Sequence, residues 1–301
     1  MSGRIVISPE VAAARRAGGP IVALESTIIS HGLPRPENLR VAREVEEAIR
    51  AEGATPATIA VVNGQVRIGL ESESLAHIAN EDDVAKVSIR DIAIVVARGG
   101  HAATTVAATC HLAHRAGIGV FATGGLGGVH REARDTWDES ADLQALSHTP
   151  MIVVCSGVKS ILDVPATLER LETLNVGVVG FGTHRFPGFY LTDSGMPVEA
   201  RVDSAADVAA IAAARCALDI PSALVVANPL PESRQIPPEI HDRILAEGLA
   251  EMERKGIRGK AVTPALIDYV HRASGGRSLE ANTEIILGNA TLAARIACAI
   301  A

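Results

Sequence analysis

Lys159 is the residue whose position in the sequence most suggests covalent chemistry. It follows the apolar segment 151–155 and the glycine-containing turn 156–158, so we expect it where a buried strand ends, near the start of a helix. A lysine in such a semi-buried place can be neutral because of burial or a neighbouring cation, and its free amine can then form a Schiff base with a sugar. A phosphate-binding lysine, or a surface lysine whose stem covers apolar neighbours, fits the same position. Both interpretations stay open on this residue alone.

Glu25 is a second candidate for chemistry at a strand end. It follows the apolar segment 21–24 and precedes Ser26 and Thr27. Ligands of α/β proteins bind beyond the carboxyl ends of the strands, so a carboxylate here could transfer a proton. A helix cap or a surface carboxylate is the more ordinary reason for such a residue, and the motif by itself is weak.

Two glycine-containing segments could hold an anion such as a phosphate. The loop 98–101 precedes Thr104 and Thr105, where a helix is expected to begin near Val106, and the segment 123–128 reads TGGLGG after a strand. Exposed N–H groups at a helix start, hydroxyls and the helix dipole favour negative charge. The alternatives are an ordinary threonine cap and a tight turn, since neither segment matches a dinucleotide or Walker pattern.

An acidic stretch could hold a hard divalent cation. Its members are Asp135, Asp138, Glu139 and Asp142, and His130 lies just upstream. Carboxylate oxygens bind such a cation, usually together with several waters. A solvated acidic helix start explains the stretch equally well, because acidic residues favour the first turn of a helix. The spacing matches neither an EF-hand nor a zinc site.

These residues must be positioned by a core almost free of aromatic side chains. Apolar residues make up 48% of the 301 residues but aromatic ones only 2%. Strand and helix signals alternate, which indicates βαβ units. We therefore predict an α/β fold, a mixed, largely parallel sheet flanked by helices, in a single domain over residues 1–301. The Asn63-Gly64 pair predicts a hairpin, and residues 237–301 are expected to be mostly helical. The expected strands are 21–24, 58–62, 65–70, 118–122, 151–155, 176–181 and 223–227.

Charge, apolar runs and cysteines narrow the class of protein. The chain has 28 Lys and Arg against 35 Asp and Glu, a net charge of −7, which argues against a nucleic acid polymer as partner. Its longest apolar runs are too short to cross a bilayer, and its start does not read as a signal peptide. Cys110, Cys155, Cys216 and Cys298 are far apart and are expected to be buried thiols. We therefore expect a cytoplasmic protein with no membrane partner.

Taken together, the segments resemble the pseudouridine-5′-phosphate glycosidase family, also called the indigoidine synthase A-like family. The resemblance covers nearly the whole chain in order. It rests on the segments ALESTIISHGLPRPEN, AVVNGQVRIGL, KVSIRD, ATTVAAT, VFATGGLGGVHR, DESADLQ, VCSGVKSILD, VVANPLPE and SLEANTEIILGNA. Motifs of this length and number are highly specific.

The resemblance implies a reaction and the residues that perform it. The family cleaves, reversibly, the carbon–carbon bond between uracil and ribose 5-phosphate through a lysine Schiff base with the ring-opened sugar. Glu25 corresponds to the proton donor, Lys159 to the nucleophile, and Asp138 to the residue that holds one Mn²⁺ per subunit, largely through water. The implied assembly is a homotrimer. The implied substrate-binding residues are Lys86, Thr105, Val106, Ser140, Ala141, Asp142 and Asn282.

One departure from the family pattern concerns the segment before Thr104. Ala102 and Ala103 stand there, where the family carries a glycine before the two threonines, and the sequence does not fix the effect of this departure on the phosphate loop. Two other functions stay open: a lysine-dependent, aldolase-type enzyme acting on a sugar phosphate, and a non-catalytic sugar-phosphate sensor. The sensor would not need both Glu25 and Lys159. The sequence does not fix the physiological direction, the metal used in the cell, or the existence of a partner kinase.

Overall fold

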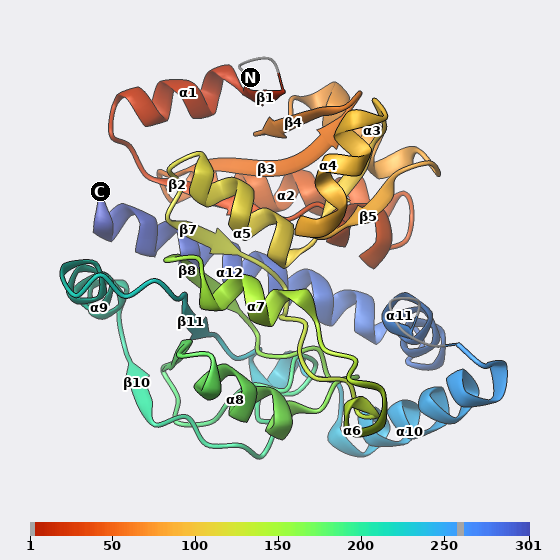
Figure 1. Ribbon diagram of the computed structural model, residues 1–301. Helices are drawn as coiled ribbons and strands as arrows, with labels where there is room; N and C mark the ends of the chain where they lie inside the picture. Colours follow the sequence, from red (N-terminus) through yellow and green to blue (C-terminus); the bar gives the residue numbers. More distant parts are fainter. Residues whose placement is uncertain (1–3, 258–261) are drawn as a thin grey trace.

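The computed structural model describes residues 4–257 and 262–301, which form a sheet with helices on both faces (Figure 1). Within these residues, eleven strands belong to one sheet in the order β1-β4-β3-β2-β7-β8-β11-β9-β10, with β6 joining β3 to β5. The strands are β1 (Ile5–Ile7), β2 (Ile21–Leu24), β3 (Thr55–Val62), β4 (Gln65–Ile68), β5 (Ala85–Val87), β6 (Ala102–Thr104), β7 (Val120–Ala122), β8 (Ile152–Cys155), β9 (Gly177–Phe181), β10 (Ala200–Val202) and β11 (Leu224–Ala227).

Helices connect and cover these strands. The α-helices are α1 (Pro9–Arg16), α2 (Glu37–Ala51), α3 (Ser72–Asn80), α4 (Ile89–Ala97), α5 (Val106–Arg115), α6 (Ala133–Thr136), α7 (Ala141–Ser147), α8 (Val164–Thr173), α9 (Ala205–Ala217), α10 (Pro238–Lys255), α11 (Val262–Ala273) and α12 (Arg277–Ile300). A π-helix, η1 (Ile28–Gly32), follows β2, and a 3₁₀ turn, η2 (Glu232–Arg234), follows β11.

The central strands are parallel and buried on both faces. β2 pairs in parallel with β7, β7 with β8, and β8 with β11, and every residue of β8 and β11 is buried. Unbroken runs of Val, Ile, Leu and Ala are what strands covered on both sides require. Because neighbouring parallel strands end at the same edge, the residues that follow β2, β7, β8 and β11 meet there.

The two faces of the sheet are covered by different helices. α12 lies behind the sheet in Figure 1 and contacts β2, β7, β8, α2 and α9, whereas α5 and α7 pack together in front. Within the described residues, α12 is the one helix long and apolar enough to cross a membrane. Its apolar side chains, among them Ile286, Ala290 and Ala293, are buried against the strands. The helix therefore serves as a core element of the fold.

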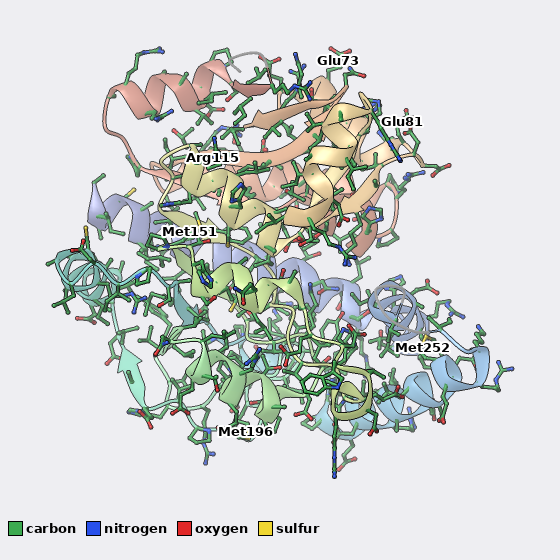
Figure 2. All side chains as sticks on the ribbon, in the orientation of Figure 1. Glu73, Glu81, Arg115, Met151, Met196 and Met252 are labelled. Carbon is green, nitrogen blue, oxygen red and sulfur yellow. The ribbon has the colours of Figure 1, made fainter. Side chains whose placement is uncertain are left out.

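The predicted fold class is confirmed: the sheet is mixed, largely parallel and flanked by helices. The hairpin at Asn63-Gly64 joins β3 and β4 in antiparallel register, with Val61 opposite Val66. The seven predicted strands lie within three residues of observed ones. Charged side chains such as Glu73 and Glu81 lie on the surface, and Met151 and Met252 are buried (Figure 2). The single domain over residues 1–301 stays a prediction.

Ala102 and Ala103 belong to the sheet, because they lie fully buried in β6 and pair with Val61 and Ala60 of β3. Their methyl groups therefore point into the core rather than toward a ligand.

The prediction of four buried thiols is wrong for two of the cysteines. Cys110 and Cys155 are buried as predicted, whereas Cys216 of α9 and Cys298 of α12 are exposed.

Candidate active site

Two adjoining cavities lie at the carboxyl ends of the central strands. The larger cavity, of about 600 Å³, extends from the ends of these strands to the start of α5 and the acidic stretch near Asp138. The smaller cavity extends from the same strand ends to η1, Phe189 and Asn282. Four side chains line both cavities, and they are Glu25, Thr27, Lys86 and Lys159. The predicted acid and the predicted nucleophile therefore share one space.

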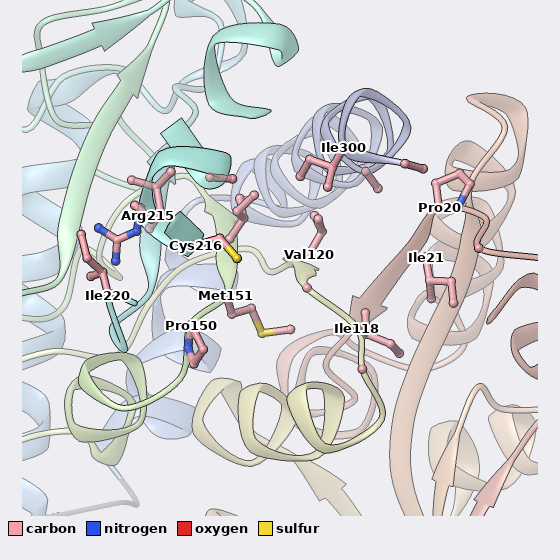
Figure 3. Close-up of a pocket in the computed structure, with 18 of the residues that line it drawn as sticks. Pro20, Ile21, Ile118, Val120, Pro150, Met151, Arg215, Cys216, Ile220 and Ile300 are labelled. Atoms are coloured by element: carbon pink, nitrogen blue, oxygen red, sulfur yellow. The ribbon is translucent and has the colours of Figure 1, made fainter. Parts of the chain in front are cut away.

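A further cavity, of about 460 Å³, lies at the opposite end of the strands (Figure 3). Its lining is mainly glycine and aliphatic, with Met151 and Cys216 and no carboxylate or lysine side chain among the described residues. The Arg215 guanidinium there donates to the backbone carbonyls of Ser222 and Ala223. This cavity lacks an acid–base pair, so the chemistry belongs at the other end of the sheet.

Glu25 is a buried carboxylate that two hydroxyl groups hold in place. Its side chain is 6% exposed, and it accepts hydrogen bonds from the Thr27 and Thr123 hydroxyls. Thr123 directly follows β7, the neighbour of β2, so the parallel register brings it to the carboxylate. A carboxylate fixed in this way has a defined orientation toward the cavity, as a proton donor requires.

Ser26 ties the loop after β2 to the start of α5. Its hydroxyl donates to the Ile59 carbonyl (2.6 Å) and accepts from the Thr104 N–H (2.9 Å). Ser26 and Thr104 are both fully buried, and the Thr104 hydroxyl also donates to Ile59 O. The serine of the Glu25-Ser26-Thr27 sequence is thus a structural link that fixes Glu25 relative to the helix.

Lys159 lies in a loop that a glycine makes possible. Gly157 has a φ of +84°, and a Cβ at this position would lie 2.1 Å from the Pro187 carbonyl oxygen. The Lys159 N–H donates to Leu126 O (3.1 Å), which fixes the lysine beside the glycine-rich segment 123–128. The expectation that Lys159 stands near a helix start is wrong, because α8 begins only at Val164.

Lys86 comes from a part of the chain far from Lys159 and lines the same two cavities. It is the middle residue of β5, which pairs with β6 and through it with β3. Its side chain lines both cavities together with that of Lys159. The fold therefore brings the predicted nucleophile and the predicted substrate-binding lysine to one space.

The start of α5 offers a backbone N–H to the larger cavity. The Ala107 N–H donates to Asp142 Oδ1 (2.9 Å), and the Ala108 N–H donates to the Thr105 hydroxyl. Within the described residues, the Val106 N–H has no acceptor, and both Thr105 and Val106 line the cavity. This remaining donor at a helix start is suited to an anion, and it belongs to Val106, one of the substrate-binding residues that the resemblance implies.

Asp142 uses both carboxylate oxygens to join two segments. Oδ1 accepts from Ala107 and Oδ2 accepts from the Gly127 N–H (2.8 Å), and the side chain is only 5% exposed. Ser140 caps α7 by accepting from the Asp142 N–H (3.2 Å). Asp142 therefore positions the walls of the larger cavity, which Ser140, Ala141 and Asp142 line.

Gly127 shows why the segment 123–128 is rich in glycine. A Cβ on Gly127 would lie 2.2 Å from Ser140 Oγ and 2.6 Å from Asp142 Oδ2. The close approach of this backbone is what allows its N–H to reach the Asp142 carboxylate. Gly127 therefore serves a close approach between two segments of the protein itself.

Asp138 is the carboxylate of the acidic stretch that suits a metal most directly. It is 34% exposed, it lines the larger cavity, and its Oδ2 lies 3.8 Å from His130 Nδ1. Asp135 lies outside both cavities, and the described residues contain no group of three or more His, Cys, Asp or Glu side chains arranged for a metal. One carboxylate fits a Mn²⁺ that keeps most of its waters and contacts a substrate phosphate.

Two aromatic residues that the sequence analysis missed belong to this region: Phe189 lines the smaller cavity, and Tyr190 hydrogen-bonds to the lining residue Asn282. Asn282 Nδ2 donates to the Tyr190 hydroxyl (3.0 Å), and burial raises the pKa of Tyr190. Phe189 has a φ of 65°, which is rare for a large side chain and is often found at functional sites. A Cβ on Gly125 would lie 2.6 Å from the Phe189 ring. The ring is thus pressed against the glycine-rich segment as an apolar wall.

α12 carries a second polar residue, Asn289, which the sequence analysis did not name, in contrast to Asn282. It is fully buried, its Nδ2 donates to Thr123 O (2.8 Å), and its Oδ1 accepts from Asn228 Nδ2 (2.9 Å). It therefore ties together the ends of β7 and β11. Its spacing of seven residues from Asn282 is two helical turns, which places both amides on one face and could have indicated this role.

The sequence of this chain matches the model of the family described as indigoidine synthase A like protein over residues 10–299. A pseudouridine-5′-phosphate glycosidase of Salinispora tropica is 60% identical over 293 residues, which are 97% of this chain and 90% of the relative. One of Saccharopolyspora erythraea is 56% identical over 296 residues, 98% of either chain.

Two solved structures are similar over nearly their full length. The prealnumycin C-glycosynthase AlnA in complex with ribulose 5-phosphate has a TM-score of 0.92 at 37% identity and covers 100% of this chain and 98% of its own. An indigoidine synthase A-like protein of Thermotoga maritima has a TM-score of 0.89 at 39% identity, with 98% and 95% covered. With a family match over nearly all residues and relatives of this identity, the chain belongs to the indigoidine synthase A like protein family.

Proposed function

We propose that this protein is a pseudouridine-5′-phosphate glycosidase, which cleaves the nucleotide to uracil and ribose 5-phosphate. The observation that carries the proposal is the shared lining of both cavities by Glu25 and Lys159 at neighbouring strand ends. The relatives of highest identity given above bear this name. The larger cavity supplies an anion site at Val106 for the phosphate, and the smaller cavity supplies apolar walls for the base.

The bond to be broken joins two carbon atoms, so protonating a heteroatom of the base does not make it a leaving group. In the proposed reaction the Lys159 amine bonds to C1 of the ribose while the C1–O4 bond breaks, and Glu25 donates the proton to O4. The substituted Lys159 nitrogen loses a proton, which returns Glu25 to its acid form, and Glu25 then protonates C5 of the base. The bond between ribose C1 and base C5 breaks, and the nitrogen lone pair forms the C=N bond of an iminium. Water hydrolyses the iminium to ribose 5-phosphate and the free amine.

The first test is the release of uracil from pseudouridine 5′-phosphate in the presence of Mn²⁺, followed by chromatography. Unphosphorylated pseudouridine is expected to react at least a hundredfold more slowly, because the dianion supplies the binding energy that positions the sugar. Comparable turnover of the two compounds would contradict the role given to the Val106 end of the larger cavity. Absence of uracil with both compounds would favour the aldolase-type or sensor function.

We further propose that Asp138 holds a Mn²⁺ ion, largely through water, which offsets the charge of the bound phosphate when present. Asp138→Ala is expected to lose Mn²⁺ binding, measured by electron paramagnetic resonance titration, and most of the activity that EDTA removes from the wild type. Asp135→Ala is the matched control, because Asp135 belongs to the same stretch but lines neither cavity. Full activity of Asp138→Ala without metal would show the stretch to be a solvated helix start.

Synthesis of the carbon–carbon bond is a second candidate, favoured by the similarity to a C-glycosynthase bound to a pentulose phosphate. Incubation of uracil with ribose 5-phosphate tests it through the appearance of pseudouridine 5′-phosphate. A homotrimer is proposed on the strength of the family resemblance, and a cytoplasmic location on the composition described under Sequence analysis. Light scattering coupled to size-exclusion chromatography measures the subunit number.

A further inference from the structure

The smaller cavity contains a polar side chain that the proposed reaction does not use, His31. It belongs to η1, the π-helix that begins three residues after Glu25. Ile28, His31 and Gly32 of this helix line the smaller cavity, together with Glu25 and Asn282. π-Helices are rare and occur mostly at functional sites, where the wide turn aims side chains that an α-helix would direct elsewhere. The irregular backbone here brings an imidazole into the cavity.

The surroundings of His31 favour the neutral form of its imidazole. Burial lowers its pKa, the positive charge of Lys86 lowers it further, and a hydrogen bond to the Val84 backbone acts in the opposite direction. A neutral imidazole has one N–H donor and one nitrogen that accepts. Since a hydrogen bond to a backbone carbonyl uses the donor, the other ring nitrogen is the acceptor.

Asn282 presents a second acceptor in the same cavity. Its Nδ2 donates to the Tyr190 hydroxyl, so its Oδ1 is the atom of the amide that can accept from a ligand. Ile28, Phe189 and Ile267 add apolar side chains to the same lining, beside the reacting groups Glu25 and Lys159. Two uncharged acceptors together with the Phe189 ring suit a planar ring with two N–H donors.

We propose that His31 is a specificity-determining residue that accepts a hydrogen bond from a ring N–H of the base. This inference rests on the proposed function, and it concerns how the base is chosen. A uracil joined through carbon C5 has two ring N–H groups, at N1 and N3, whereas a uracil joined through N1 has only the one at N3. With His31 as a second uncharged acceptor beside Asn282, the C-linked nucleotide can pair both ring N–H groups, whereas the N-linked nucleotide can pair only one, and the site therefore favours the C-linked nucleotide.

The test is a thermodynamic cycle between protein and ligand. Dissociation constants are measured by calorimetry in the Lys159→Ala background, which prevents turnover, for pseudouridine 5′-phosphate and for its 1-methyl and 3-methyl analogues. Each analogue replaces one N–H by N–CH3 and so removes one donor. With His31 present, one of the two analogues is expected to bind about tenfold more weakly than the parent. With His31→Leu, the same replacement is expected to change binding less than twofold.

Two further variants separate recognition from a structural effect. His31→Gln, whose amide oxygen can accept, is expected to restore part of the discrimination. His111→Leu is the control, because His111 is also a partly buried histidine with a lowered pKa but lines neither cavity. Equal penalties for both analogues with His31 and with His31→Leu would overturn the proposal. That outcome with normal uracil release by the wild type refutes only the role of His31, whereas absence of uracil release refutes the proposed function as well.

Discussion

Lys159→Ala is expected to lower turnover of pseudouridine 5′-phosphate by at least about three orders of magnitude, because no other group would carry the covalent intermediate. Incubation of the wild type with ribose 5-phosphate and borohydride is expected to reduce the imine to a stable amine. Peptide mass spectrometry then places the adduct on Lys159. The variant is expected to keep its fold, since the lysine side chain is only half-buried and its backbone bond to Leu126 is unchanged.

Lys86→Ala is the matched comparison, because both lysines line the same two cavities. It is expected to weaken substrate binding and to retain the borohydride adduct on Lys159. An adduct on Lys86 in the wild type would mean that the two roles are reversed. No adduct on either residue under turnover conditions would argue against the Schiff-base route itself.

The frame of this site could be predicted because strand ends are visible in the sequence. Apolar runs without interruption mark β2 and β8, so the residue order alone places Glu25 and Lys159 at strand ends. Parallel pairing of β2, β7 and β8 then brings these ends together. The hairpin after β3 was equally plain, because Asn63 and Gly64 both have the positive φ that such a turn requires.

The remaining parts of the site depend on pairings that no local pattern reveals. β5 and β6 have three residues each, too few for a periodic signal, yet β5 carries Lys86 into the cavity. Asp142 is acidic and close to a helix start, which suits a metal ligand or a solvated cap equally well. Only the fold shows that its oxygens meet the N–H groups of Ala107 and Gly127.

The aromatic wall was also beyond sequence reasoning. Phe189 lies in a segment without regular strands or helices between β9 and β10, and its positive φ is set by tertiary contacts rather than by residue type. The place of His31 in the cavity could not be predicted either, because it follows from a π-helix over residues 28–32 that no sequence pattern in this segment indicates. Polar residues in α12 gave a usable signal, because Asn282 and Asn289 interrupt an apolar helix at a spacing of two turns.

Glu25→Gln is expected to lower turnover by about two to four orders of magnitude, the usual range for a group that transfers a proton in the transition state. The amide has nearly the shape of the carboxylate, and the Thr27 and Thr123 hydroxyls that donate to Glu25 can rotate to accept from it. The fold and the affinity for ribose 5-phosphate are therefore expected to change little, as measured by thermal unfolding and calorimetry.

Thr123→Val separates proton transfer from orientation, because it removes one hydroxyl that holds the carboxylate and leaves the acid itself. Its loss of turnover is expected to be about tenfold, with the order wild type, Thr123→Val, Glu25→Gln. Glu25→Gln is also expected to form the borohydride adduct with ribose 5-phosphate, since that sugar opens its ring in solution and needs no protonation of O4 by the protein. With pseudouridine 5′-phosphate as substrate the same variant is expected to form almost no adduct, because ring opening then depends on Glu25. Equal adduct yields from both compounds would place the proton donor elsewhere in the cavity.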